Sequence, residues 1–416
     1  MRFPNLADAE CPSNSKISYI VRRGLKPLLY FCQMKKIVLL ILLSLICLSA
    51  HGASLEFAFQ LGEEQNPRLD KLLPNVASRI TFNKDNTKLI AHEIGGSIVE
   101  WDLQNRQKRV IYTVGEDQWS AYTQRLNYLL VPKENGGISV IDVKNGNKIQ
   151  IGKMRDEMDG QYEIGYFSPE SYLAALTEGD NEIEIWRFLY AGIISGKNGK
   201  TKIEMTPWKI YNLKTQLPVR NGIVISSRHA YLAAAEGTYQ DDEGHRTIIE
   251  VWTDFAKQPE HIFDTSEILG MWNLIFSDGS QMLAVDTQLN GKSGIRVWEM
   301  HTGRQLLNKS GFEAYWTRAL AFAPINYNLT TDEMHANLKT KGYLRMYYLA
   351  SGDEKGNLRV WGIPYRISKI LETKSVIWAT YSTGIQALAF SPNGEYLAVA
   401  LWDTTIKILR WKKDAQ

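Results

Sequence analysis

Residues 388–409 read LAFSPNGEYLAVALWDTTIKIL, and this stretch indicates how the rest of the chain folds. An apolar run ends at Phe390 and is followed by residues 391–394 (SPNG), a cluster that favours turns. A second apolar run, 396–400, and a third, 406–409, come next, and the last of these alternates inward and outward residues. Alternation with a period of two residues is typical of β-strands. The stretch therefore predicts a meander of three antiparallel strands.

The third strand of this meander recurs along the chain. Its pattern is Ile or Leu, any residue, an apolar residue and then Trp, and it begins at residues 183, 249, 295 and 358 (IEIW, IEVW, IRVW and LRVW). Degenerate copies begin at residues 98, 138 and 406 (IVEW, ISVI and IKIL). Repetition of this kind indicates units that bury their apolar faces against one another. A large aromatic at a recurring position buries well, so we interpret the tryptophans as packing between units; they are Trp101, Trp186, Trp252, Trp298 and Trp361.

The first two strands repeat in the same register. An apolar or aromatic residue ends each first strand, and a leucine follows it in the second strand, about seven residues later except in the sixth unit, where an insertion intervenes. The predicted pairs are Phe82 with Leu89, Tyr122 with Leu129, Phe167 with Leu173, Ile225 with Leu232, Phe276 with Leu283, Phe322 with Leu349, and Phe390 with Leu397. Two independent signals in one register predict seven units.

A fourth strand is predicted after each third strand except the last. The predicted fourth strands are 109–112, 148–151, 208–211, 261–263, 305–307 and 366–371. The last unit lacks one, whereas residues 55–61 (LEFAFQL) alternate apolar and polar residues at the other end of the repeats. We therefore predict that this N-terminal strand completes the last unit and closes the ring, which leaves no exposed sheet edge at the junction. Insertions at 187–207, 237–246 and 324–343 are predicted to enlarge loops.

These residues resemble the WD-repeat β-propeller family, most clearly at 391–409 and at 351–361 (SGDEKGNLRVW), and the resemblance covers residues 54–416. It implies an all-β fold, a seven-bladed β-propeller of four-stranded antiparallel blades. The repeats are degenerate, because the Gly-His dipeptide of the family is absent before the first strands and its Trp-Asp dipeptide follows the third strand only at Trp101-Asp102. A two-domain chain is the competing architecture, but no linker rich in Pro, Gly or Ser separates the repeats.

Composition and charge exclude some functions. Lys and Arg number 48, Asp and Glu number 45, and seven of the basic but only two of the acidic residues lie in residues 1–53. The rest of the chain is close to neutral, so it has no basic field for wrapping nucleic acid. The cysteines are Cys11, Cys32 and Cys47, which all precede the repeats, so the repeats hold no disulfide or thiolate metal site.

The N-terminal part predicts export. Met34-Lys35-Lys36 precedes an apolar run, 37–50, which small residues follow up to Ala53. A positive start, a short apolar core and small residues are typical of a secretory signal peptide, and the run is short for a membrane span. We predict that 34–53 is a cleaved signal peptide, with an uncleaved signal anchor as the alternative, and that 1–33 is an upstream extension, not native or disordered. The expected location is the periplasm or the exterior, as for an exported, bacterial-type protein.

No catalytic, cofactor or metal motif stands out. Residues 196–201 (GKNGKT) lack the first glycine of a phosphate loop, and His92-Glu93 lacks the second histidine of a zinc-protease helix. Glu236 and residues 241–243 gather acidic groups, but their spacing fits no calcium loop, so we interpret them as an exposed acidic loop. We expect no cofactor and no metal, and a protein that is not an enzyme.

Mostly polar residues lie four positions before the anchor of each first strand, where a core strand would be apolar. In a propeller these positions surround the mouth of the central channel; they are Ser78, Gln118, Glu163, Asn221, Trp272, Arg318 and Gln386, with Trp119 and Trp316 beside them. Trp and Arg are frequent among binding hot spots. The predicted partner-binding residues are Trp119, Glu163, Asn221, Trp272, Arg318 and Gln386. A water-filled channel lined by ordinary polar residues is the alternative.

The function implied by the resemblance is that of an interaction platform. We predict an exported, monomeric scaffold that binds a protein partner through the channel-mouth face, with no nucleic acid and with membrane contact only if the signal segment is retained. Propellers also host other functions. The alternative is therefore a small-ligand or glycan-binding propeller, or a propeller enzyme, in the cell envelope.

Overall fold

Antiparallel strands account for most of what the computed structural model describes. The described residues are 53–65, 73–113, 121–123, 128–132, 138–142, 148–151, 162–167, 172–177, 182–195, 201–217, 219–226, 231–237, 247–254, 256–265, 273–289, 292–313, 315–325, 331–365 and 374–413. Residues Ala53–Lys413 form one compact unit. The predicted signal peptide, the extension before it and the three cysteines lie outside the described residues, except that Ala53 begins the first strand.

The strands form four-stranded antiparallel sheets whose orders are β2-β3-β4-β5, β6-β7-β8-β9, β10-β11-β12-β13, β14-β15-β16-β17, β18-β19-β20-β21, β22-β23-β24-β25 and β1-β28-β27-β26. The strands that precede residue 200 are β1 Ala53–Leu61, β2 Ala77–Phe82, β3 Lys88–Glu93, β4 Ser97–Asp102, β5 Lys108–Thr113, β6 Ala121–Thr123, β7 Tyr128–Pro132, β8 Ile138–Asp142, β9 Lys148–Ile151, β10 Tyr162–Phe167, β11 Tyr172–Thr177 and β12 Glu182–Ser195. The later ones are β13 Thr201–Lys214, β14 Val219–Ile225, β15 Leu232–Gly237, β16 Thr247–Trp252, β17 His261–Asp264, β18 Leu274–Phe276, β19 Met282–Leu289, β20 Lys292–Glu299, β21 Gln305–Glu313, β22 Thr317–Phe322, β23 Arg345–Asp353, β24 Asn357–Tyr365, β25 Lys374–Thr380, β26 Ile385–Phe390, β27 Tyr396–Leu401 and β28 Ile406–Lys413.

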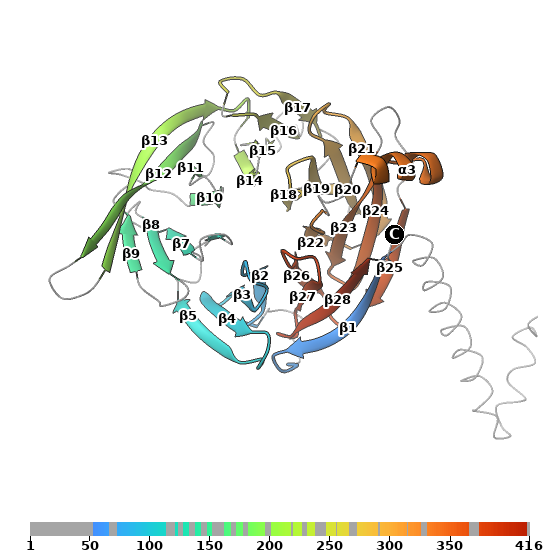
Figure 1. The fold of residues 1–416 in the computed structure, drawn as a ribbon, viewed down its shortest axis with the longest axis horizontal. Coiled ribbons are helices and arrows are strands. Elements are labelled where there is room, and N and C mark those ends of the chain that lie inside the picture. Colours follow the sequence, from blue (N-terminus) through green and yellow to red (C-terminus); the bar gives the residue numbers. More distant parts are fainter. Residues whose placement is uncertain are drawn as a thin grey trace, which may run out of the picture. The chain divides into compact units, whose positions relative to one another are not determined.

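Neighbouring sheets contact each other through their first strands. The first strand of each sheet from β6 to β26 lies against the first strand of the next sheet along the chain, and β26 also lies against β2 (Figure 1). The sheets joined by these contacts therefore pack face to face, and the fourth strand of each lies at the edge opposite its first strand. The fold is thus all-β, as the sequence predicted.

The predicted cross-strand pairs are confirmed without exception. Each anchor of a first strand lies directly opposite its leucine in the second strand, for all the pairs from Phe82 with Leu89 to Phe390 with Leu397. Each leucine in turn lies opposite the last residue of the third-strand pattern, as Leu89 does with Trp101 and Leu349 with Trp361. The repeat in the sequence is therefore one row of directly opposed residues on three strands of each sheet.

Three tryptophans of these rows, Trp101, Trp298 and Trp361, fill the space between sheets, as predicted, whereas the side chain of Trp186 lies outside those that the structure describes. Trp298 of β20 is buried among Ala233, Val251 and Phe263 of the preceding sheet, and its ring stacks on Phe263 with centroids 4.7 Å apart. Trp361 of β24 packs in the same way on the β18–β21 sheet, and Trp101 of β4 packs on the sheet that contains β26–β28. Burying aromatic surface between two sheets stabilises both, because neither sheet can bury that face alone.

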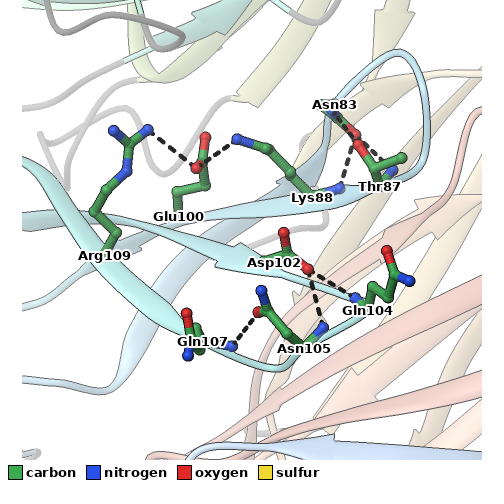
Figure 2. Close-up of polar contacts among 9 residues, drawn as sticks. All are labelled: Asn83, Thr87, Lys88, Glu100, Asp102, Gln104, Asn105, Gln107 and Arg109. Atoms are coloured by element: carbon green, nitrogen blue, oxygen red, sulfur yellow. Dashed lines mark hydrogen bonds and ion pairs between the residues drawn. The ribbon is translucent and has the colours of Figure 1, made fainter.

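Short side chains fix the turns of the β2–β5 sheet. The Asn83 carboxamide oxygen accepts hydrogen bonds from the backbone amides of Thr87 and Lys88, both at 3.0 Å. The Asp102 carboxylate accepts from the amides of Gln104 at 2.9 Å and Asn105 at 3.0 Å, at the turn between β4 and β5 (Figure 2). Asn and Asp favour such positions because their side chains can bond to the backbone a few residues ahead.

Strand β1 forms the outer strand of the last sheet. It runs antiparallel to β28, from Ala53 opposite Lys413 to Leu61 opposite Ile406, with an irregularity near Phe57. Leu55 and Leu61 are buried. The predicted strand therefore exists and pairs at the predicted place, and β28 is longer than the four residues that the sequence indicated.

One predicted fourth strand is wrong. The expected segment, 366–371, lies outside the described residues, and the strand that pairs with β24 is β25 at Lys374–Thr380. The reason is the length of β24, which continues to Tyr365 opposite Arg345 of β23, so that the chain must return before it can pair along Asn357–Gly362.

Two of the predicted loop insertions contain regular structure. The insertion 187–207 is mostly strand, because β12 and β13 continue as a paired ribbon beyond Arg187. The insertion 324–343 contains the helix α3, Thr331–Lys341, whose residues are mostly polar. The third insertion, 237–246, lies outside the described residues except for Gly237. Of the helices that the described residues form, none has both the length and the apolar character that a membrane span needs.

Candidate functional site

The structure describes only some of the predicted binding residues in full. Trp119 and Trp272 lie outside the described residues. Glu163 lies in β10 and Asn221 in β14, where the backbone alone is described. Arg318 and Gln386 lie in β22 and β26, one residue after the start of each strand. The candidate site is therefore built around these last two residues.

Arg318 is held by a carboxylate and an aromatic ring. Its Nε donates to Glu354 Oε1 at 2.7 Å, and its Nη2 donates to the same oxygen. The guanidinium carbon lies 4.9 Å from the centre of the Trp316 ring. The backbone amide of Glu354 donates to the Trp316 carbonyl at 3.1 Å, which ties the residues before β22 to the turn between β23 and β24. A guanidinium that is paired and stacked in this way is fixed in orientation.

A second cation and ring lie beside the first. The Lys355 ammonium is 4.5 Å from the centre of the Tyr315 ring, and Tyr315 is 40% exposed. The turn that carries Lys355 is rigid, because the buried Asp353 carboxylate accepts from the amides of Lys355 and Asn357, each at 2.9 Å. Tyr315 and Trp316 thus each lie against a cationic side chain of the same sheet, Lys355 and Arg318. Residue types that are frequent in binding hot spots are therefore concentrated on one surface.

Gln386 is tied to a turn of its own sheet, the one between β27 and β28. The Trp402 indole Nε1 donates to Gln386 Oε1 at 2.8 Å, and the Trp402 backbone amide donates to the Gly384 carbonyl at 2.9 Å. This bond uses the amide oxygen of Gln386 and orients the amide nitrogen, which can serve as a donor to a ligand. Both Gln386 and Trp402 are partly exposed.

Gly384 is the point at which the two parts of the surface meet. A methyl carbon added there would lie 2.7 Å from Cε2 of the Trp402 ring and 2.8 Å from the carbonyl oxygen of Glu354. The turn that carries the Arg318 partner and the ring that binds Gln386 are therefore both in contact with the Gly384 backbone. We call residues 315–318, 353–357, 381–386 and 402–404 the Arg318 surface. It spans loop ends of two neighbouring sheets.

Further hydrogen bonds fix the turn between β27 and β28, which belongs to the Arg318 surface. The buried Asp403 carboxylate accepts from the Thr405 amide at 3.0 Å and its hydroxyl at 2.6 Å. The Thr404 hydroxyl donates to the Glu63 carbonyl at 2.9 Å, so the segment after β1 contacts this turn. Burial raises the pKa of Tyr381 to about 12, so its phenol stays protonated near neutral pH.

A histidine at the same end of the β2–β5 sheet remains uncharged. Burial, assisted by the nearby positive charge of Arg79, lowers the pKa of His92 from 6.5 to about 4. The hydroxyl of Ser78, one of the ring positions, donates to the His92 carbonyl at 3.0 Å. Burial also raises the pKa of Glu93, although its contact with Lys108 opposes that shift. His92 therefore contributes no charge to this face at neutral pH.

The other charged cluster of the β2–β5 sheet lies on β3, β4 and β5. Glu100 is 5% exposed, and its Oε1 accepts from Lys88 Nζ at 2.7 Å and from Arg109 Nη2 at 3.0 Å (Figure 2). The corresponding position of the other third strands holds Val or Ile, as at Val251 and Ile408. Because both cations come from the same sheet and one carboxylate oxygen is already shared by them, we interpret this cluster as structural.

The described residues offer binding chemistry rather than an obvious reactive group. Among them, no three side chains of His, Cys, Asp or Glu are placed to hold a metal ion. The Nε2 atom of His261 lies 2.7 Å from the Met300 carbonyl oxygen, and this contact joins two neighbouring sheets. The Arg318 surface instead presents fixed donors and partly exposed rings, which suit recognition of another molecule.

Sequence reasoning found the two strand positions of the Arg318 surface but missed their partners. Glu354, Lys355 and Trp402 lie in turns between second and third strands, and Tyr315 precedes a first strand. These turn positions could have been predicted from the sequence. In an antiparallel sheet, residues just after a second strand lie at the same end as residues at the start of a first strand.

The comparisons with known proteins support a WD-repeat propeller. The family model described as WD domain, G-beta repeat matches residues 374–409. This match runs from β25 to β28, so one sequence repeat joins the last strand of one sheet to three strands of the next. No curated protein matches the chain in sequence.

Two solved structures have a similar fold. One is a chain of the Crystal Structure of Mitotic Checkpoint Complex, with 15% identity, a TM-score of 0.54, and coverage of 85% of this chain and 92% of that chain. The other is a chain of Kuenenia stuttgartiensis Hydrazine Synthase, with 16% identity, a TM-score of 0.56, and coverage of 84% of this chain and 99% of that chain. At these identities the likeness concerns the fold alone.

Proposed function

We propose that this chain is an exported interaction scaffold, a seven-bladed propeller closed by β1, which binds a protein partner through the Arg318 surface. The observation that carries the proposal is the fixed array of two cation–ring contacts and the Trp402–Gln386 bond on one pair of neighbouring sheets. Surfaces with Trp, Tyr and Arg held in place before binding lose little side-chain entropy when a partner docks. The match to a WD repeat agrees with such a role.

The closed ring is the part of this proposal that concerns architecture. It is supported by the pairing of β1 with β28 and by the contact of β26 with β2. If the last blade holds both the first and the last strand of the propeller, the ring cannot open unless β1 separates from β28. The loops of the last two blades, which carry the Arg318 surface, are then stabilised by this closure.

The binding experiment compares matched variants. The test variant is Arg318→Ala with Gln386→Ala. The control is Lys84→Ala with Gln104→Ala, which also removes one basic and one amide side chain, but from the β2–β3 and β4–β5 turns of another sheet, where first strands end rather than begin. Both variants serve as baits in affinity capture from the native cell envelope, with quantitative mass spectrometry. We expect one protein to be enriched at least tenfold by the wild type and by the control, and to be lost with the test variant. Equal capture by all three baits would refute the binding face.

A glycan or other small ligand is the second candidate function. The partly exposed rings of Trp316 and Trp402 beside amide and guanidinium donors favour it, because sugars stack on aromatic rings and bond to such donors. Melting-temperature screens of the wild type and the test variant against glycans and metabolites separate this possibility. A ligand that stabilises the wild type but not the test variant would support it over a protein partner.

Export has its own test. We expect the mature chain isolated from the native host to begin close to residue 54, and no peptide from Asn5–Lys16 to occur. Fractionation of the host followed by intact mass measurement reads both outcomes. A chain that retains residues 34–53 and sediments with membranes would instead support the signal-anchor alternative.

A further inference from the structure

The β12–β13 hairpin continues beyond the sheet to which it belongs. β11 pairs with β12 only as far as Tyr172 opposite Arg187, whereas β12 and β13 stay paired from Phe188 opposite Pro207 to Ser195 opposite Thr201. Figure 1 shows these two strands running on together past the end of β11. We call residues 188–195 and 201–207 the arm. Within the described residues, no strand pairs with either edge of the arm.

The β12 half of the arm has the composition of a buried strand, whereas the β13 half reads TKIEMTP and alternates polar with apolar residues. Residues 188–195 of β12 read FLYAGIIS and contain no charged or strongly polar side chain. On β13, Ile203 lies opposite Ile193 and Met205 lies opposite Tyr190. Alternation places Phe188 and Tyr190 on one face of β12 and Leu189 on the other, so apolar residues of this strand occupy both faces. Strands with two apolar faces are normally covered on both sides. A two-stranded ribbon alone in water is at best marginally stable, so a further strand along its edge would stabilise this arm.

The two edges of the arm are not equivalent. Pro207 lies in β13 and has no backbone N–H, and proline on an outer strand hinders the addition of a further strand there. The edge of β12 from Phe188 to Ser195 contains no proline and no charge. An added strand is therefore directed to β12 rather than to β13.

The β12 edge is complementary to a second copy of itself. If two copies pair antiparallel about a two-fold axis between Ala191 and Gly192, Leu189 lies opposite Ile194, and Tyr190 opposite Ile193. Small residues then meet at the axis, apolar residues meet on both sides of it, and no like charges oppose each other. The irregularity of β12 between Tyr190 and Ile193 falls at this axis and adds one residue, because their partners Met205 and Ile203 are only two residues apart. Tyr190 and Ile193 therefore share one face and Leu189 and Ile194 the other, as a two-fold axis at this point requires.

We propose that two copies of this chain associate through their arms, with β12 pairing antiparallel to β12 of the second copy. The result is a four-stranded sheet with two-fold symmetry, which is the commonest symmetry of soluble oligomers. This inference departs from the monomer expected from the sequence. It does not depend on the binding face proposed above.

The first test removes the arm without disturbing the sheet. Residues 189–206 are replaced by Asn-Gly, a two-residue hairpin turn that joins Phe188 to Pro207, which lie opposite each other. The full chain and this variant are compared by sedimentation velocity from about 1 to 100 µM, because a contact of this size forms a weak dimer. The full chain is expected to approach twice the monomer mass, whereas the variant stays monomeric. Both share the N-terminal segment, so a mass difference reports on the arm.

The second test measures the register and needs no deletion. In a full chain with Cys11, Cys32 and Cys47 replaced by serine, the double variant Leu189→Cys with Ile194→Cys has no other thiol. Because opposite residues share a face, mild oxidation is expected to give a covalent dimer on a non-reducing gel. The control, Leu189→Cys with Ser195→Cys, shifts one thiol to the other face and is expected to cross-link at least fivefold less.

Three results would overturn the proposal. These are a monomeric full chain at 100 µM, an unchanged dimer after loss of the arm, and equal cross-linking by the two cysteine variants. A monomeric full chain that binds lipid vesicles, with binding lost in the arm-deleted variant, would assign the arm to a membrane surface instead.

Discussion

Replacement of Gly384 by alanine tests the link between the fold and the Arg318 surface. The added methyl carbon would lie 2.7 Å from Cε2 of Trp402 and 2.8 Å from the Glu354 carbonyl oxygen, closer than real Cβ atoms approach other atoms. The backbone oxygen cannot swing away as a side-chain tip could, so the turn or the indole must shift. Overpacking of this kind costs about 1–3 kcal/mol. With an unfolding entropy of about 2.1 cal/mol/K per residue over the propeller, we expect the melting temperature to fall by about 1–4 °C.

The control for this prediction is Gly342→Ala, a second glycine replacement with a different cause of strain. Gly342 has a φ of +77° and no atom within 4 Å of the added methyl, so it pays for backbone strain without crowding. Both variants are measured by urea unfolding and by Trp fluorescence, and a partner, once identified, by its affinity. Only Gly384→Ala should change the fluorescence and weaken binding, because only it displaces Trp402. A Gly384→Ala protein with unchanged stability and fluorescence would refute this account of how the two sheets meet.

Three further perturbations test other parts of the structure. Trp298→Ala should lower the free energy of unfolding by about 3–5 kcal/mol in urea titrations, and Trp298→Phe by clearly less, because a smaller cavity then remains beside Phe263; equal losses would contradict inter-sheet packing. Deletion of residues 54–61 should lower the stability by at least about 3 kcal/mol through its two buried leucines alone, and an unchanged melting curve would rule out the closed ring. Because the pKa of His92 is lowered from 6.5 to about 4, its contribution to stability is present above pH 6.5 and is lost as the pH falls toward 4, by about 3 kcal/mol at most. The variant His92→Gln should therefore show a flatter dependence of unfolding free energy on pH in this range. Glu93, whose pKa is raised, acts in the opposite direction in both proteins.

The strands and their register could be predicted because the signals are local. The anchor and the leucine that face each other are usually about seven residues apart, as Phe390 and Leu397 are, so one turn fixes both positions. The pair of Phe322 with Leu349 was found across an insertion because the pattern resumed in the same register beyond it. Periodic burial on one face leaves the same trace in every unit.

The errors arose where two alternating segments compete. Residues 366–371 follow Trp361 at the usual distance, but β24 is unusually long and the fourth strand is 374–380. In the insertion 187–207 the first segment, 188–194, is a continuous apolar run, and such a run has no polar side to distinguish a strand from a buried loop. Such cases depend on how far a strand extends in three dimensions, which local patterns do not report.

The candidate site was only half accessible to sequence reasoning. Arg318 and Gln386 follow from their fixed offset to the strand anchors. The partner of Arg318 is Glu354, 36 residues away and on the far side of an insertion that contains a helix, so no spacing rule indicates it. Trp402 is 16 residues from Gln386 and belongs to the turn of a different pair of strands.

The internal pairing of the Arg318 surface also sets the kind of binding that it supports. The charge of Arg318 is neutralised by Glu354, and the Trp316 ring lies close to its guanidinium, so Lys355 is the cation of this surface that no described carboxylate balances. Long-range steering by such a surface is weak, whereas its fixed donors and rings reduce the entropy cost of docking. We therefore expect partner affinity to change less than about threefold between 50 and 500 mM salt, measured by calorimetry or biolayer interferometry. A tenfold or larger loss over that range would mean that charge, and not the preformed Arg318–Trp316 and Gln386–Trp402 contacts, dominates recognition.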